Sequence, residues 1–248
     1  MSRIPMVVLL ATAALLAGPP AAAGVHEDMV ALDRTYVPAL VLTNRPDAEP
    51  ARRAIAALRT EWNAFRSRYA VAPAGYSGAA WQRATGEVEA AIAAAEKQIA
   101  AGKGPAAHQD LEAVREAMYT LRREARVAYY MDDLTAFHTA MERIATAVGG
   151  RSAQALTDGD VAAVRAALPE VETTWATVVA NRAAVARHID DPERQAAAQA
   201  QIDVQTATLS GLKAAVAAGN REGIATYGNA LKPGFSKLFT LFGAAPAK

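Results

Sequence analysis

The 248-residue sequence contains 26 Lys and Arg, 25 Asp and Glu, and no Cys. The absence of Cys excludes structural disulfides, thiolate metal ligands, Cys nucleophiles and covalently attached c-type haem. The nearly balanced charge, without a polybasic stretch, gives no indication of binding to nucleic acid or to an anionic membrane surface.

Residues 1–23 have the layout of a secretory signal peptide. Arg3 precedes an apolar run and a tract of small residues, in which Ala21 and Ala23 fit the small-x-small cleavage pattern. The apolar run is shorter than the roughly 20 residues that span a bilayer. We therefore expect export to the periplasm, cleavage near Ala23, a mature chain that begins near Gly24, and no transmembrane span after cleavage. An uncleaved N-terminal anchor is the alternative.

The rest of the sequence predicts an all-α protein. It is rich in Ala, Leu, Val, Glu and Arg, and its β-branched and aromatic residues do not alternate with polar residues over the length of a strand. Turn-rich segments and Gly residues divide this part of the chain into helices. The predicted helices cover residues 26–43, 51–70, 79–102, 106–126, 127–148, 160–189, 192–218 and 221–242.

Two sequence correspondences indicate that the helical region is duplicated. A shift of 113 residues superposes the apolar stripe of residues 55–65 on that of residues 168–178, with a Trp in the same place in each. The segment AEKQIAAGK at 95–103 likewise corresponds to LKAAVAAGN at 212–220, and a Gly closes each helix.

The duplication predicts two tandem antiparallel four-helix-bundle repeats, over residues 24–126 and 127–248. Between Leu121 and Val127 the apolar phase slips, but no Gly or Pro intervenes. We therefore expect one long or gently broken central helix to join the two bundles.

Each half resembles the periplasmic four-helix bundles of the cytochrome b562 and cytochrome c′ type, especially in the helix that ends at IAAG and in the amphipathic helix that follows it. In the b562 type, a Met in the first helix and a His in the last hold haem. Met29 stands in the corresponding first helix, but YTLRREARVAYY and LKPGFSKLFTLFG contain no His, and the Cys-x-x-Cys-His of the c′ type is absent. The resemblance thus implies an exported bundle whose haem-ligand pattern is missing, and we expect no cofactor.

The segment YYMDDLTAFHTAMERI, residues 129–144, carries the densest set of candidate metal ligands. His138 and Glu142 are one helical turn apart, and Asp33 holds the place of His138 in the first half. Imidazole and carboxylate together suit a divalent transition metal such as zinc, copper or iron. His26, near the processed terminus, is placed to complete such a site, although a loosely held terminus is the simpler interpretation. A solvated His–Glu pair is the alternative to a metal site.

A second candidate site is apolar. Tyr36, Tyr130, Phe235 and Phe239 are aromatic residues that can line a groove for a hydrophobic ligand or for a partner helix. Packing within the core is the alternative interpretation, because residues at these positions follow helical spacing.

The sequence contains no catalytic motif that we can identify. It has no Gly-x-Ser-x-Gly elbow, phosphate loop or His-Glu-x-x-His, and no Glu-x-x-His pair of the di-iron type. We therefore expect a non-enzymatic periplasmic binding or accessory protein, whose ligand is small and apolar or a partner helix. The alternative is a periplasmic protein that handles copper, zinc or iron through His138, Glu142 and Asp33.

Overall fold

The computed structural model describes residues 24–244, and all of the regular elements within this range are helices. None of the helices in this range has the combination of length and hydropathy that a bilayer-spanning segment needs. The α-helices are α1 (Val25–Leu42), α2 (Ala48–Arg68), α3 (Gly78–Ala100), α4 (Gly104–Glu124), α5 (Tyr130–Val148), α6 (Asp158–Ala180), α7 (Val185–His188), α8 (Pro192–Ala217) and α9 (Arg221–Thr240). Two short 3₁₀ turns, η1 (Ala153–Ala155) and η2 (Arg182–Ala184), flank α6.

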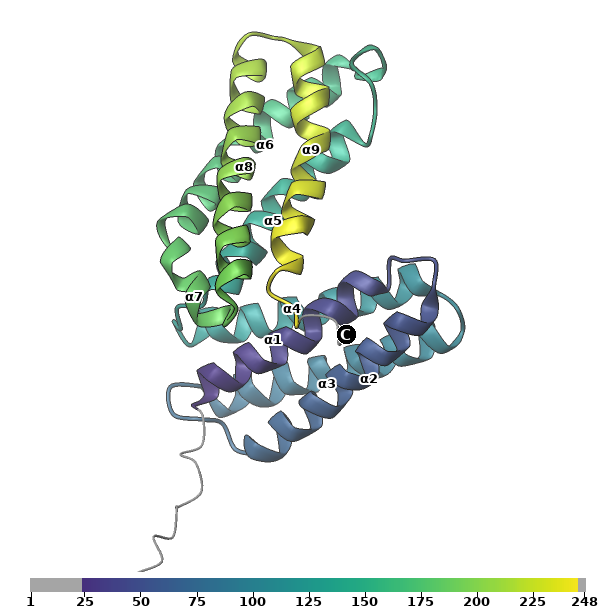
Figure 1. The fold of residues 1–248 in the computed structure, drawn as a ribbon, viewed down its shortest axis with the longest axis vertical. Coiled ribbons are helices and arrows are strands. Elements are labelled where there is room, and N and C mark those ends of the chain that lie inside the picture. Colours follow the sequence, from purple (N-terminus) through teal and green to yellow (C-terminus); the bar gives the residue numbers. More distant parts are fainter. Residues whose placement is uncertain (1–23, 245–248) are drawn as a thin grey trace, which may run out of the picture.

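The long helices pack in pairs that form two groups. In the N-terminal group, α1 packs on α2 and α3 packs on α4; in the C-terminal group, α5 packs on α6 and α8 packs on α9. The C-terminal group stands upright in Figure 1, and helices α1–α4 run across beneath it. The groups touch where α1 meets α9 and where α4 meets α5. The all-α prediction is therefore confirmed, and the predicted duplication stays an inference from the sequence.

Side-chain and backbone caps set the helix limits. Asp191 begins α8 by accepting hydrogen bonds from the backbone N–H groups of Glu193 and Arg194, and Pro192 takes the first helical position as the sequence predicts. Helices α3 and α8 end in the same motif, with Gly102 and Gly219 in the left-handed region (φ 72° and 64°). These are the two Gly residues that the sequence correspondence aligns.

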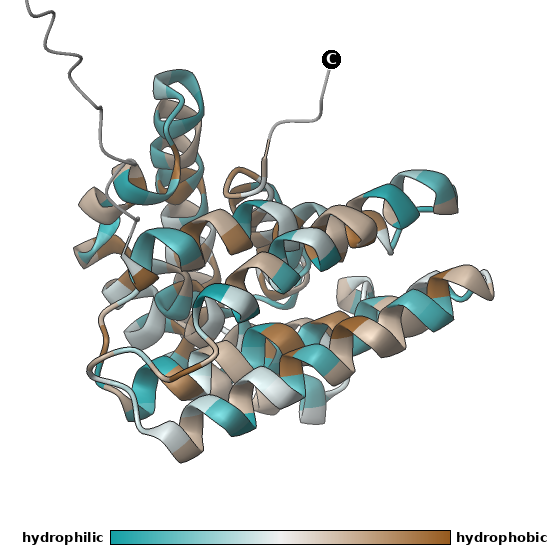
Figure 2. Ribbon diagram, turned by 90° about the horizontal axis from the view of Figure 1, so that it is seen from below, coloured by the Kyte–Doolittle hydropathy of each residue, from teal (hydrophilic) through white to brown (hydrophobic). Residues whose placement is uncertain are grey.

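The apolar stripes predicted from the sequence form the cores of both groups. Trp62 is buried in the N-terminal group and Trp175 in the C-terminal group. Each indole N–H finds an acceptor, the carboxylate of Glu89 for Trp62 and the hydroxyl of Thr206 for Trp175, both close to 3 Å. Most helices in Figure 2 carry hydrophobic and hydrophilic segments in alternation, as amphipathic helices do.

The prediction of a long central helix was wrong. Helix α4 ends at Glu124 and α5 begins at Tyr130, and Arg126 between them has a left-handed φ of 56°. The N–H of Val127 donates a hydrogen bond to the carbonyl of Arg122. This bond ends the helix in the way that is usual when a Gly occupies the position of Arg126. A non-Gly residue in this conformation costs about 1–2 kcal/mol, so the surrounding contacts must stabilise it.

The prediction that the sixth helix runs to residue 189 was also wrong. Helix α6 ends at Ala180, and Asn181 caps it before η2 and the single turn of α7. The side chain of Asn181 donates a hydrogen bond to the carboxylate of Asp133 on α5 (2.8 Å), which holds this end of α6 against its neighbour. The change of direction brings His188 back to the junction between the two groups.

A buried ion pair connects the two groups at this junction. Arg122 of α4 donates hydrogen bonds from Nε and Nη2 to both carboxylate oxygens of Asp132 on α5, and the two side chains are only 4% and 9% exposed. The guanidinium carbon lies 4.1 Å from the ring centre of Tyr129. The phenol of Tyr129 in turn donates a hydrogen bond to Asp33 on α1. These four side chains join α1, α4, α5 and the turn that precedes α5.

We predict that Arg122→Met lowers the free energy of unfolding by about 3–5 kcal/mol, because it leaves the carboxylate of Asp132 buried without its partner. Urea denaturation followed by circular dichroism measures the change. The matched control is Arg83→Met, which removes an ion pair with Glu124 whose side chains are 46% and 47% exposed, and we expect it to change the stability far less. Equal effects of the two substitutions would contradict this account of the junction.

Candidate functional site

An open groove lies where α1 and α4 face α5 and α9. Its volume is about 620 Å³, within the range of about 300–1,000 Å³ that is typical of small-molecule sites. Leu40 and Val41 of α1 and Phe235 and Phe239 of α9 supply its apolar lining. Charged and polar side chains, most of them from α4 and α5, supply the remainder.

A chain of alternating charges crosses the groove, with Arg115 of α4 at its centre. The Arg115 side chain is 7% exposed, and its Nη2 donates hydrogen bonds to the carboxylate of Glu112 and to Nδ1 of His138 on α5 (3.0 Å for the latter). Its Nε has no hydrogen-bond acceptor among the described residues, and the nearest carboxylate oxygen, on Glu116, is 3.8 Å away. Arg115 therefore links the two helix groups and also keeps an unused donor.

The contact with Arg115 selects one tautomer of the neutral His138 imidazole. A guanidinium can only donate, so Nδ1 of His138 must accept, and the proton of the neutral imidazole resides on Nε2. Nε2 lies 3.1 Å from Oε1 of Glu142, one helical turn further along α5. His138 thus faces a carboxylate on one side and accepts from a guanidinium on the other.

Glu142 and Lys232 complete the chain. The hydrogen bond from His138, aided by Lys232 of α9 at 2.8 Å, lowers the pKa of Glu142 to about 2 against the opposing effect of burial. Burial alone would raise the pKa of Glu112, but His108 and Arg115 hold it below its usual value. Both carboxylates are therefore ionised at neutral pH.

His108 connects the other end of the chain to α1. Its Nδ1 lies 2.9 Å from the carbonyl oxygen of Leu40 and 3.0 Å from Nδ2 of Asn44. Its Nε2 is 3.4 Å from Glu112. Besides its two imidazoles, the groove holds three carboxylates, those of Glu112, Glu116 and Glu142, and the two cations of Arg115 and Lys232.

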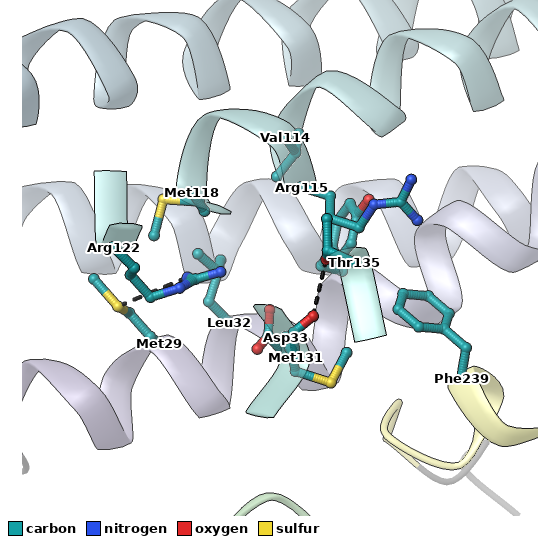
Figure 3. Close-up of a pocket in the computed structure, with 11 residues that line it drawn as sticks. Met29, Leu32, Asp33, Val114, Arg115, Met118, Arg122, Met131, Thr135 and Phe239 are labelled. Carbon is teal, nitrogen blue, oxygen red and sulfur yellow. Dashed lines mark hydrogen bonds between the residues drawn. The ribbon is translucent and has the colours of Figure 1, made fainter. Parts of the chain in front are cut away.

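A second, much smaller cavity of about 20 Å³ lies beside the groove, at the junction between the helix groups. Met29 and Asp33 line it from α1 and Arg122 from α4, and the volume is enough for about one water molecule. In Figure 3 the guanidinium of Arg115 points away from Asp33, above the ring of Phe239. Arg115 and Phe239 line both the cavity and the groove.

Asp33 is the carboxylate that lines this cavity, and its pKa is shifted well above the usual value. Burial raises the pKa of Asp33 to about 6, although the charge of Arg122 and the hydrogen bond from Tyr129 act in the opposite direction. Its carboxyl group is therefore partly protonated in mildly acidic solution.

The predicted metal ligands are not brought together. His138 and Glu142 are neighbours in the groove, as predicted, whereas Asp33 lies in the separate cavity and is bonded to Tyr129. Within residues 24–244, no group of three or more His, Asp or Glu side chains is arranged to hold a metal ion. Arg115 and Lys232 contact the atoms of His138 and Glu142 that a metal would need.

The predicted apolar groove is present, but with two of its four residues. Phe235 and Phe239 line it. Tyr36 instead faces the core of the N-terminal group, where its hydroxyl donates to the carbonyl of Leu111 (3.1 Å). Tyr130 packs on Phe242, with ring centres 5.7 Å apart, near His188. Tyr36 and Tyr130 are therefore not groove residues.

The sequence prediction missed the residues of α4 that face the groove. His108 and Glu112 have the same one-turn spacing as His138 and Glu142, and this shared spacing was the available signal. The position of Arg115 opposite His138 depends on how the two groups pack, and local spacing does not reveal it.

Comparison of the chain with protein-family models, with curated proteins and with solved structures gives no match. The resemblance to cytochrome b562 and cytochrome c′ bundles therefore stays a prediction from the sequence.

We predict that Asp33→Asn raises the stability of the protein at pH 7.5 by about 1–3 kcal/mol. The pKa of Asp33 is raised on folding, so its favourable contribution is full below about pH 4 and is lost as the pH rises through about 6. The gain from Asn should therefore vanish near pH 4. Thermal denaturation at both pH values measures it, with exposed Glu87→Gln as the control. A gain of equal size at both pH values would contradict the assignment.

Proposed function

We propose that this protein is a non-enzymatic binding protein that holds a small, partly apolar ligand in the groove between α1, α4, α5 and α9. The observation that carries the proposal is the groove itself, which has the volume of a small-molecule site, an apolar side formed by Phe235 and Phe239, and a polar side centred on Arg115. A partner helix is a less suitable occupant, because the ordered ion pairs across the groove interrupt its apolar surface.

The chain of charged side chains in the groove favours the binding of a ligand over catalysis. A general base needs a free acceptor near its substrate, but Oε1 of Glu142 already lies 2.8 Å from the ammonium of Lys232 and 3.1 Å from Nε2 of His138. Glu112 is likewise bonded to Arg115 and faces His108. Side chains that are fixed in this way orient a ligand at little cost in conformational entropy.

Export to the periplasm, with removal of a signal peptide, is part of the proposal. Residues 1–23, on which the signal prediction rests, lie outside the described residues. Helix α1 begins at Val25, so cleavage after Ala23 leaves every helix of the described residues intact. The two helix groups further support, as part of the same proposal, an origin in two tandem four-helix repeats.

We predict that Thr139→Trp weakens the binding of Nile red, an uncharged apolar dye, by at least about tenfold, because the indole fills the groove. Thr139 is exposed and lines the groove, so the substitution leaves the core unchanged. Thr173→Trp places the same side chain at an exposed position of α6 and is the matched control. Fluorescence titration measures both affinities.

Two results would count against the proposal. One is dye binding that Thr139→Trp and Thr173→Trp change to the same extent. The other is the absence of saturable dye binding by the unsubstituted protein.

A further inference from the structure

The described chain begins with the residues Gly24, Val25 and His26. Cleavage after Ala23, which the export proposal includes, makes His26 the third residue of the processed protein. A free amine, two backbone amide nitrogens and the Nδ1 of a third-residue His can surround one metal ion with four nitrogen atoms in a plane. Cu(II) and Ni(II) prefer such a square-planar nitrogen environment.

The start of α1 leaves these nitrogen atoms available. Val25 and His26 are the first residues of the helix, and the first N–H groups of a helix have no acceptor within it. Gly24 is exposed, and no side chain caps the helix there. Its ψ of 165° must rotate for its amine and the Val25 nitrogen to face the same ion, which breaks the hydrogen bond from the Asp28 N–H to the Gly24 carbonyl. Glycine allows this rotation without a steric penalty.

A second observation at the same place points to a ligand. His188 of α7 is 3% exposed, and its Nδ1 has no hydrogen-bond partner among the residues described. Its ring centre lies 6.2 Å from that of His26, and the ring of Tyr129 contacts both. The buried imidazole of His188 therefore has an unused ring nitrogen and lies beside His26.

We propose that the processed chain binds one Cu(II) ion through the amine of Gly24, the amide nitrogens of Val25 and His26 and Nδ1 of His26, with the imidazole of His188 as an additional ligand. Binding releases the two amide protons and the proton of the amine, so the complex strengthens as the pH rises. The copper stays in the Cu(II) state throughout. The site rests on the export proposal and is independent of the groove.

The test uses protein that is purified from a bacterial periplasm without a histidine tag, with its N-terminus established by intact mass. Cu(II) is added, and the protein is dialysed against glycine, which removes weakly bound copper. We expect one copper per chain, with the visible and electron paramagnetic resonance spectra of a planar four-nitrogen site. A variant with one additional alanine before Gly24 should lose this copper, because His26 then becomes the fourth residue, and His26→Ala should lose it as well.

The alanine-extended variant is the matched control, because it keeps every side chain and every helix. Retention of copper by this variant, or a processed terminus other than Gly24, would overturn the proposal. His188→Phe should keep the copper and change its spectrum, and an unchanged spectrum would remove His188 from the ligand set. Nile red binding should be equal in the processed and the alanine-extended proteins, so failure of the copper site and failure of the groove are distinguishable.

Discussion

The ion pair between Arg122 and Asp132 constrains the arrangement of the whole molecule. The two residues are ten positions apart and lie on opposite sides of the break between α4 and α5. Their charges are almost fully buried, and a buried charge without a partner is strongly unfavourable. The chain must therefore turn back between them so that the two side chains meet, which explains why Arg126 adopts a left-handed conformation at a place where Gly is usual.

The groove follows from this constraint. Once α4 and α5 meet at Arg122 and Asp132, they diverge towards His108 and Glu142, and the space between them is the groove. Arg115, two turns of α4 before Arg122, provides the second connection through His138. The groove thus has a closed end at the junction, where Arg122 and Asp132 are buried, and an open end lined by polar residues. This geometry separates a structural ion pair from a polar network that a ligand can reach.

Features that depend on local sequence could be predicted. The buried stripes that contain Trp62 and Trp175 follow from helical spacing, and the ends of α3 and α8 follow from Gly102 and Gly219. The end of α4 could not be predicted, because Arg126 carries no local signal for a left-handed conformation. His138 and Glu142 could be recognised as neighbours because they are one helical turn apart on α5.

The spacing of residues along each helix could not predict the contacts between the two helix groups. Asp33 and His138 hold equivalent places in the two halves of the sequence, and a symmetric pair of bundles would bring such places together. The structure instead pairs His138 with Arg115 and Asp33 with Tyr129. The packing of the two helix groups at the junction, and not the repeat that the sequence predicts, decides which side chains meet.

The junction also selects the neutral forms of its other ionisable groups. Burial raises the pKa of Asp33 to about 6 and lowers that of His188 to about 4, so both shifts favour the uncharged side chain. The contribution of Asp33 to stability is full below about pH 4 and is lost as the pH rises through about 6. That of His188 is full above about pH 6.5 and is lost as the pH falls through about 4. Between these limits the two contributions change in opposite directions with pH. The junction therefore tolerates one buried ion pair, between Arg122 and Asp132, and favours the neutral forms of the acid and the base beside it.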